Sequence, residues 1–202
     1  MASNTGLRPA ARRVMIWPAA DGLFTHSDGW NMAIPPTEAD GQSLTPEIAV
    51  LLHQLDEGYV KKAWHGPNLR GSIRGLSSEQ AAWRPAPGRH SIAEHVLHAA
   101  YWKYAVRRRL RGDARGSFPL KGSNWFPVNA GLSPAKWKSH VALLEAEHRA
   151  LREVISAFPP DQLFRLAEGG KVTNLALISG IAAHDVYHAG QIQLLKRLPP
   201  PR

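Results

Sequence analysis

The sequence predicts an all-α protein built as an antiparallel four-helix bundle. Three observations carry this prediction. Four long segments repeat their apolar residues with a period near 3.6, each segment begins at a residue suited to cap a helix, and no segment shows the period of 2 expected of a half-buried strand. With 202 residues, the chain is long enough for one domain whose core needs no disulfide or structural metal.

Residues 1–43 differ from everything after them. They are rich in Gly, Pro, Ser, Asn and Asp, and they show neither of the two periods. They also lack the continuous apolar core and the small-residue cleavage site of a secretory signal. We therefore expect a disordered N-terminal extension over residues 1–43 and one bundle domain over residues 44–198. Met32 precedes the first convincing helix by a short polar lead, so one hypothesis is that Met32, and not Met1, is the biological start.

The first two long helices are defined by their starts. Thr45 is suited to be an N-cap, and Pro46 takes the first helical position, where a missing amide hydrogen costs nothing. The second long helix is predicted to begin at Ser91, with Glu94 three residues later completing a capping box. Its pattern runs to about Arg111. Shorter helical pieces are expected between these two helices.

The last two long helices follow a loop. Residues 116–131 have no regular period and carry several aromatic residues, and loops of this length in a compact domain are usually functional or mobile. The third helix is predicted to start at Ser133 with Pro134 at its first position, and the fourth near Thr173. Gly190, inside the fourth helix, is explained most simply as a close contact with a neighbouring helix.

Composition excludes several classes of protein. The chain has no cysteine, so disulfides, thiolate nucleophiles and Cys-ligated metals are ruled out, and any metal must be held by His, Asp, Glu or carbonyl groups. No apolar run reaches the length that a membrane span requires, so we expect no membrane association and a cytoplasmic location.

The chain is strongly basic, with a formal net charge of +9. Such a charge attracts phosphate backbones nonspecifically. However, the sequence contains no DNA- or RNA-binding motif and no aromatic platform interleaved with basic residues, so a solvated basic face is favoured over a nucleic-acid groove.

Histidines supply the candidate chemistry. His184 and His188 are four residues apart on the face of the fourth helix that also carries Ile181, so both are expected to point into the bundle. The second long helix offers His95 and His98, of which an ion between facing helices needs only one. An HxxxH pair alone is a frequent accident, and ordinary core histidines remain an alternative at this point.

Two segments resemble a known family when taken together. "HSIAEHVLHAAYW" and, far downstream, "HDVYHAGQIQLLKR" are similar to the motifs of the DinB-like superfamily of four-helix-bundle metalloproteins, and "AAWRPAPG" before the first motif also fits its pattern. The resemblance covers roughly residues 45–197. It implies that His98, His184 and His188 are the metal ligands and that His95 is not. Zinc or nickel is the expected divalent ion, and iron or manganese would also be tolerated by three imidazoles.

The resemblance also implies a range of functions. Metal-dependent members include enzymes that use a low-molecular-weight thiol such as bacillithiol, mycothiol or glutathione, so a thiol S-transferase acting on a small molecule in detoxification or stress response is expected first. A metal-dependent hydrolase remains an alternative, as does a non-catalytic metal-binding bundle or dimerisation protein. A homodimer is a further expectation from the family.

Five residues outside the triad are predicted around the site. Gln191 lies three residues after His188 and is expected either to hydrogen-bond a ligand or to pack between helices. His65 is expected at the mouth of the pocket or as a helix-terminal cap, and Trp125 at a substrate entrance. Lys103 and Arg107, one and two turns beyond His98, are expected to contact an anionic substrate.

Overall fold

The computed structural model describes residues 38–39 and 42–198, and it confirms the predicted all-α bundle. Two short strands pair as an antiparallel hairpin before the first helix. The rest of the predicted N-terminal extension, Met32 included, lies outside the described residues. The elements in chain order are β1 (Glu38–Ala39), β2 (Gln42–Ser43), α1 (Pro46–Tyr59), α2 (Leu69–Ser72), α3 (Ser78–Ala82), α4 (Ile92–Arg111), α5 (Pro134–Ser156), the 3-10 turn η1 (Pro160–Gln162) and α6 (Asn174–Arg197).

The four long helices begin at the predicted residues. Thr45, Ser91, Ser133 and Thr173 are their N-caps, and the last three each accept a hydrogen bond from a backbone amide of the first turn. Ser91 also completes the predicted capping box with Glu94, which satisfies two amides that a helix start leaves unpaired.

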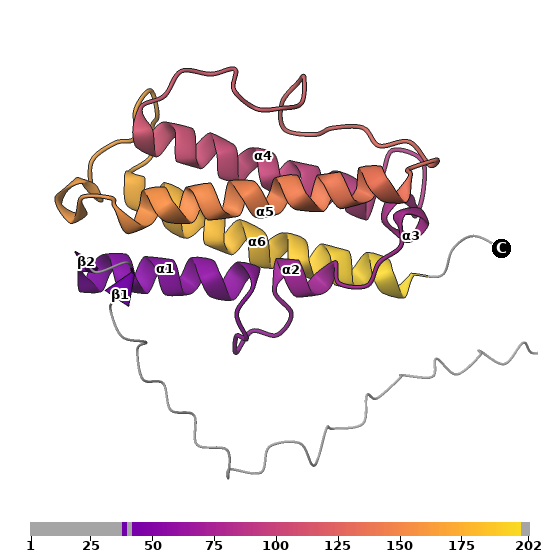
Figure 1. The fold of residues 1–202 in the computed structure, drawn as a ribbon, viewed down its shortest axis with the longest axis horizontal. Helices are drawn as coiled ribbons and strands as arrows, with labels where there is room; N and C mark the ends of the chain where they lie inside the picture. The colour runs from indigo at the N-terminus through magenta and orange to yellow at the C-terminus, as the bar shows by residue number, and fades with distance from the viewer. Residues whose placement is uncertain (1–37, 40–41, 199–202) are drawn as a thin grey trace, which may run out of the picture. The chain divides into compact units, whose positions relative to one another are not determined.

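The four long helices lie side by side, with α4 and α5 on one side and α1 and α6 on the other (Figure 1). His95 of α4 lies against His188 of α6, while Lys103, further along α4, meets Asp185, so α4 and α6 run antiparallel. The helices α1 and α5 also run antiparallel, because Asp56 meets Arg152 while Tyr59 meets His148. By contrast, α4 and α5 run parallel, because residues 112–133 cross back over α4 before α5 begins. Antiparallel packing therefore describes two of the neighbouring pairs and not all of them.

The buried side chains form two apolar clusters. One gathers around the first half of α4, the start of α5 and the end of α6, and includes Val96, Leu144 and Ile192. The other gathers around α1, the end of α5 and the start of α6, and includes Leu55 and Ile178. Lys103 on α4, and Asp185 and His188 on α6, are buried polar residues that lie between the two clusters along their helices.

The close helix contact predicted at Gly190 is instead made by Gly58. A β-carbon added at Gly58 would lie 2.8 Å from the carbonyl oxygen of Ala182, so only glycine lets α1 approach α6 this closely. Gly190 is exposed, and a β-carbon there would meet no atom within 4 Å. The prediction for Gly190 was wrong because periodicity shows which face a residue occupies only approximately, and this glycine lies just outside the buried face.

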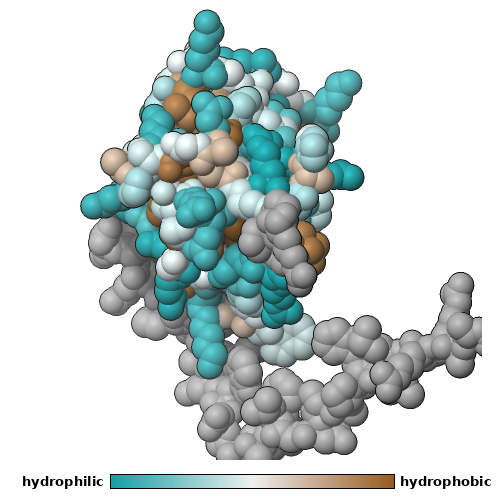
Figure 2. Space-filling view, turned by 90° about the vertical axis from the view of Figure 1, so that its right-hand side faces the viewer, coloured by the Kyte–Doolittle hydropathy of each residue, from teal (hydrophilic) through white to brown (hydrophobic). Residues whose placement is uncertain are grey.

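Within the described part of the chain, no helix combines the length and the apolar character needed to cross a membrane. The end of the bundle that carries α3 and the end of α6 is covered mostly by hydrophilic residues, and hydrophobic residues show there only in small areas (Figure 2).

Candidate metal centre

The predicted triad converges in the structure. The Nε2 atoms of His98 and His184 are 3.2 Å apart, and those of His184 and His188 are 3.0 Å apart. One ligand atom from each of the three residues lies within 4.8 Å of the others. Two nitrogens bound to one tetrahedral zinc ion at about 2.0–2.1 Å would be about 3.3–3.4 Å apart. The spacing therefore fits a group that could hold one divalent ion.

For His98 and His188, hydrogen bonds determine which ring nitrogen has a free lone pair for a metal ion. The Nδ1–H of His98 donates to the backbone carbonyl of Asn124 over 2.9 Å, and the Nδ1–H of His188 donates to Oε1 of Gln191 over 2.6 Å. Both acceptors are carbonyl oxygens, which cannot donate, so both Nε2 atoms carry lone pairs. An Nε2–H of His184 could donate a hydrogen bond to the Nε2 of His98 or to that of His188, but not to both. The three nitrogens therefore suit a shared cation better than hydrogen bonds among the rings.

The triad stays neutral at ordinary pH. Burial lowers the pKa of His184 to about 3 and that of His188 to about 4, and the neighbouring histidines lower both further. Burial also lowers the pKa of His98, against the opposing effect of its bond to Asn124. A metal must displace a proton from a charged imidazole before it binds, so these neutral rings are ready ligands.

The loop between α4 and α5 completes the site. Asn124 has a positive φ of 64°, a left-handed conformation that asparagine tolerates better than most residues. This conformation lets its carbonyl reach His98 while its side-chain oxygen accepts a hydrogen bond from Trp102 Nε1 over 3.0 Å. Trp125, predicted to line an entrance, stacks on His98 with ring centroids 3.9 Å apart and on His90 with centroids 3.6 Å apart.

Asn124 and His90 were not predicted from the sequence. Asn124 acts through its backbone, and no pattern in an aperiodic loop identifies a carbonyl that will face a histidine. His90 lies just before the N-cap of α4, outside the helical repeat that singled out the other histidines. Its signal was its place as the first residue of the motif "HSIAEHVLHAAYW".

His95 is buried beside the triad but stands apart from it. Its Nδ1 lies 3.1 Å from Nδ1 of His188, which is the nitrogen that faces away from the other ligands. Burial lowers the pKa of His95 to about 3, so it too is neutral. This placement agrees with a supporting role outside the ligand set.

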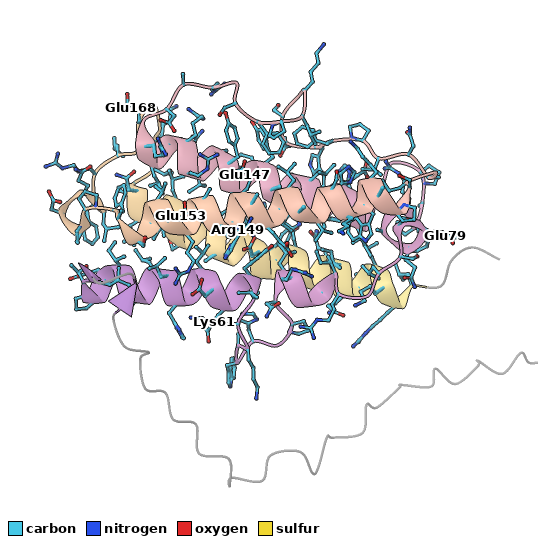
Figure 3. All side chains as sticks on the ribbon, in the orientation of Figure 1. Lys61, Glu79, Glu147, Arg149, Glu153 and Glu168 are labelled. Atoms are coloured by element: carbon cyan, nitrogen blue, oxygen red, sulfur yellow. The ribbon has the colours of Figure 1, made fainter. Side chains whose placement is uncertain are left out.

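The structure corrects the expected anion contacts. Lys103 is fully buried and forms an ion pair with Asp185 inside the bundle, so it cannot reach an anion in solution. Arg107 pairs over 3.0 Å with Glu147 of α5, the residue that is labelled near α4 in Figure 3. Both follow His98 at helical spacing, but the helix turns them toward carboxylates of α6 and α5.

His65 lies away from the metal centre. It is exposed and lines a surface depression with Val186 and Gly190. Val186 is two residues from His184 and therefore about 200° around α6 from it. The prediction that His65 stands at the pocket mouth is wrong, because the turn after α1 approaches the outer side of α6.

One ligand lies at the edge of a cavity. A cavity of about 150 Å³ between α4 and α6 is lined by His184 together with mostly apolar residues, among them Trp102, Val106 and Ile181. This is the approach by which a small molecule could reach the triad from the side of His184.

A bundle of four long helices with three inward histidines from two of them defines a helical protein whose interior can hold a divalent metal ion. A family model for the DinB superfamily matches residues 63–192, and the chain belongs to that superfamily. No curated protein and no solved structure matches the chain.

Proposed function

We propose that this protein is a divalent-metal-dependent enzyme that transfers a low-molecular-weight thiol to an electrophilic small molecule. His98, His184 and His188 would hold the ion, with zinc or nickel preferred by three nitrogen ligands. The observation that carries the proposal is the convergence of three Nε2 atoms beside a cavity that His184 shares. Three protein ligands leave a coordination position for a small molecule.

The bound ion would supply acidity, because a divalent cation lowers the pKa of a coordinated thiol and so provides thiolate at neutral pH. The chain supplies orientation and a dry environment. Asn124 and Gln191 hold the rings of His98 and His188 with Nε2 toward the site. Trp125 covers one face of His98 and keeps water from it.

The buried carboxylates nearest the triad are not free to act as general bases. Attack by water generally uses a carboxylate or histidine as a general base. Asp185 is occupied by Lys103, and Glu94 is occupied by Arg84 and by the backbone amides of Ser91 and Val128. Neutral His95, beside His188, is the base that a hydrolase would use, and the two activities are therefore separated by the turnover test below.

The test is turnover of the metal-loaded full-length chain with 2-mercaptoethanol and 1-chloro-2,4-dinitrobenzene. A carbon–sulfur bond forms, chloride leaves, and the thiol proton passes to solvent. We expect metal-dependent loss of thiol that is abolished in His188→Ala and retained in His53→Ala, because His53 lies on the exposed side of α1. Hydrolysis of p-nitrophenyl acetate without thiol consumption would replace the proposal with a hydrolase. Turnover of neither compound by the metal-loaded protein would refute an enzyme of either kind.

A further inference from the structure

A larger hollow lies beside the cavity that His184 lines. A groove of about 600 Å³ runs between the second half of α4 and the loop that follows it. Tyr104 anchors the loop to the helix, because its hydroxyl accepts hydrogen bonds of 3.2 Å from the backbone amides of Gly116 and Ser117. The groove therefore has two walls that are joined to each other.

The groove is positively charged. Arg108, Arg109, Arg115 and Lys121 all line it, and none of its lining residues is acidic. Among the ion pairs formed within residues 42–198, none uses any of these four side chains. Arg108 and Arg109 lie on the α4 wall, and Arg115 and Lys121 lie on the loop wall. Cations without a carboxylate partner that line one groove concentrate anions from solution.

Neighbours of these cations on α4 behave differently. Arg107 pairs with Glu147, and Arg111 pairs with Asp113 over 3.0 Å. The basic run of α4 is thus divided, with some members neutralised by the fold and others directed into the groove. The positive charge of the groove is a property of the folded chain and not only of its composition.

The groove shares part of its wall with the approach to the metal centre. Trp102, Ala105 and Arg109 line both the groove and the smaller cavity that His184 shares. Asn124 also lines the groove, and its backbone carbonyl accepts the hydrogen bond from Nδ1 of His98. Trp102 and Arg109 are two helical turns apart, or about 10 Å along α4. A small molecule of that length could lie with one end beside His184 and the other among the arginines.

We propose that this groove binds the carboxylate or phosphate groups of an anionic substrate whose reacting end lies at the metal centre. This inference rests on the proposed function and assigns its substrate class. Arginine suits the role because its planar guanidinium donates paired hydrogen bonds to carboxylates and phosphates. The groove takes over the role that the sequence suggested for Lys103 and Arg107.

The test uses two anions that cannot donate a thiol. Inorganic pyrophosphate and S-methylglutathione are titrated into the full-length protein at low salt by isothermal calorimetry. We expect at least one of them to bind once per chain and to bind about ten-fold more weakly to Arg109→Gln and to Arg115→Gln, because each loses a charged hydrogen bond. Arg74→Gln is the matched control, since Arg74 is exposed in the turn after α2 and lines none of the groove.

Two results would overturn the inference. One is the absence of saturable binding by both anions, and the other is equal weakening by Arg74→Gln, which would indicate diffuse attraction to a basic chain. A different pair of results would show that the proposed function, and not the groove, is wrong. In that case the anion still binds and depends on Arg109, but 2-mercaptoethanol is not consumed. If the groove alone is wrong, turnover of this neutral thiol persists and anion binding is absent.

Discussion

Replacing Lys103 with methionine should destabilise the fold severely. Lys103 and Asp185 are both fully buried, and Oδ1 of Asp185 has no hydrogen-bond partner within the described residues. Burial lowers the pKa of Lys103 and raises that of Asp185, while their mutual attraction opposes both shifts. Lys103→Met keeps the apolar stem but leaves a buried carboxyl group without its partner. We expect a loss of about 3–5 kcal/mol in the free energy of unfolding, measured by urea denaturation.

Two further variants separate the missing partner from other causes. Lys103→Met combined with Asp185→Leu removes both charges, and we expect it to recover stability to within about 1 kcal/mol of the original chain or to exceed it. Arg111→Met breaks the exposed pair with Asp113 and should cost less than about 1 kcal/mol. A cost below about 1 kcal/mol for Lys103→Met, or no recovery in the double variant, would refute the reasoning.

Three other predictions follow from single residues. His148 is buried and stacked on Tyr59, and burial lowers its pKa to about 3, so the unfolded chain binds more protons below pH 6.5 and stability rises with pH from about 3 to 6.5. In metal-free protein, His148→Phe should therefore reduce the loss of unfolding free energy between pH 7 and pH 5 by about 2 kcal/mol. Gly190→Ala should raise the free energy of unfolding by about 0.5–1 kcal/mol in the same urea assay, because the site is open and helical. Gln191→Leu should weaken metal affinity about 10–100-fold in a chelator competition, because it removes the acceptor that orients His188.

Each of these has a clear contrary result. An unchanged pH dependence in His148→Phe would mean that His148 is not held neutral by the fold. A destabilised Gly190→Ala would mean that a neighbour covers this face of α6. Unchanged metal affinity in Gln191→Leu would restore the packing role that the sequence left open for Gln191.

The sequence predicted the fold well because its signals are local. Thr45, Ser91, Ser133 and Thr173 define helix starts through their own short-range chemistry, and all four are N-caps in the structure. The direction of the helices is not a local property. It depends on a loop that crosses the bundle, and nothing in residues 112–133 indicates which way that loop runs.

The candidate site was predictable to the extent that it follows helical spacing. His184 and His188 share a face by periodicity, but only the family resemblance chose His98 over His95. Which charge meets which carboxylate depends on the rotation of neighbouring helices, and for that reason Lys103 could not be assigned to Asp185 from sequence. Asn124 could not be found at all, since it contributes a backbone carbonyl.

The most direct test of the three-histidine centre is the metal content of the purified full-length protein, measured by elemental analysis. We expect about one divalent ion per chain, with His98→Ala and His188→Ala each losing most of it and His53→Ala keeping it. Circular dichroism should show that all three variants retain their helices. Full metal occupancy in both His98→Ala and His188→Ala would contradict the assignment of the site.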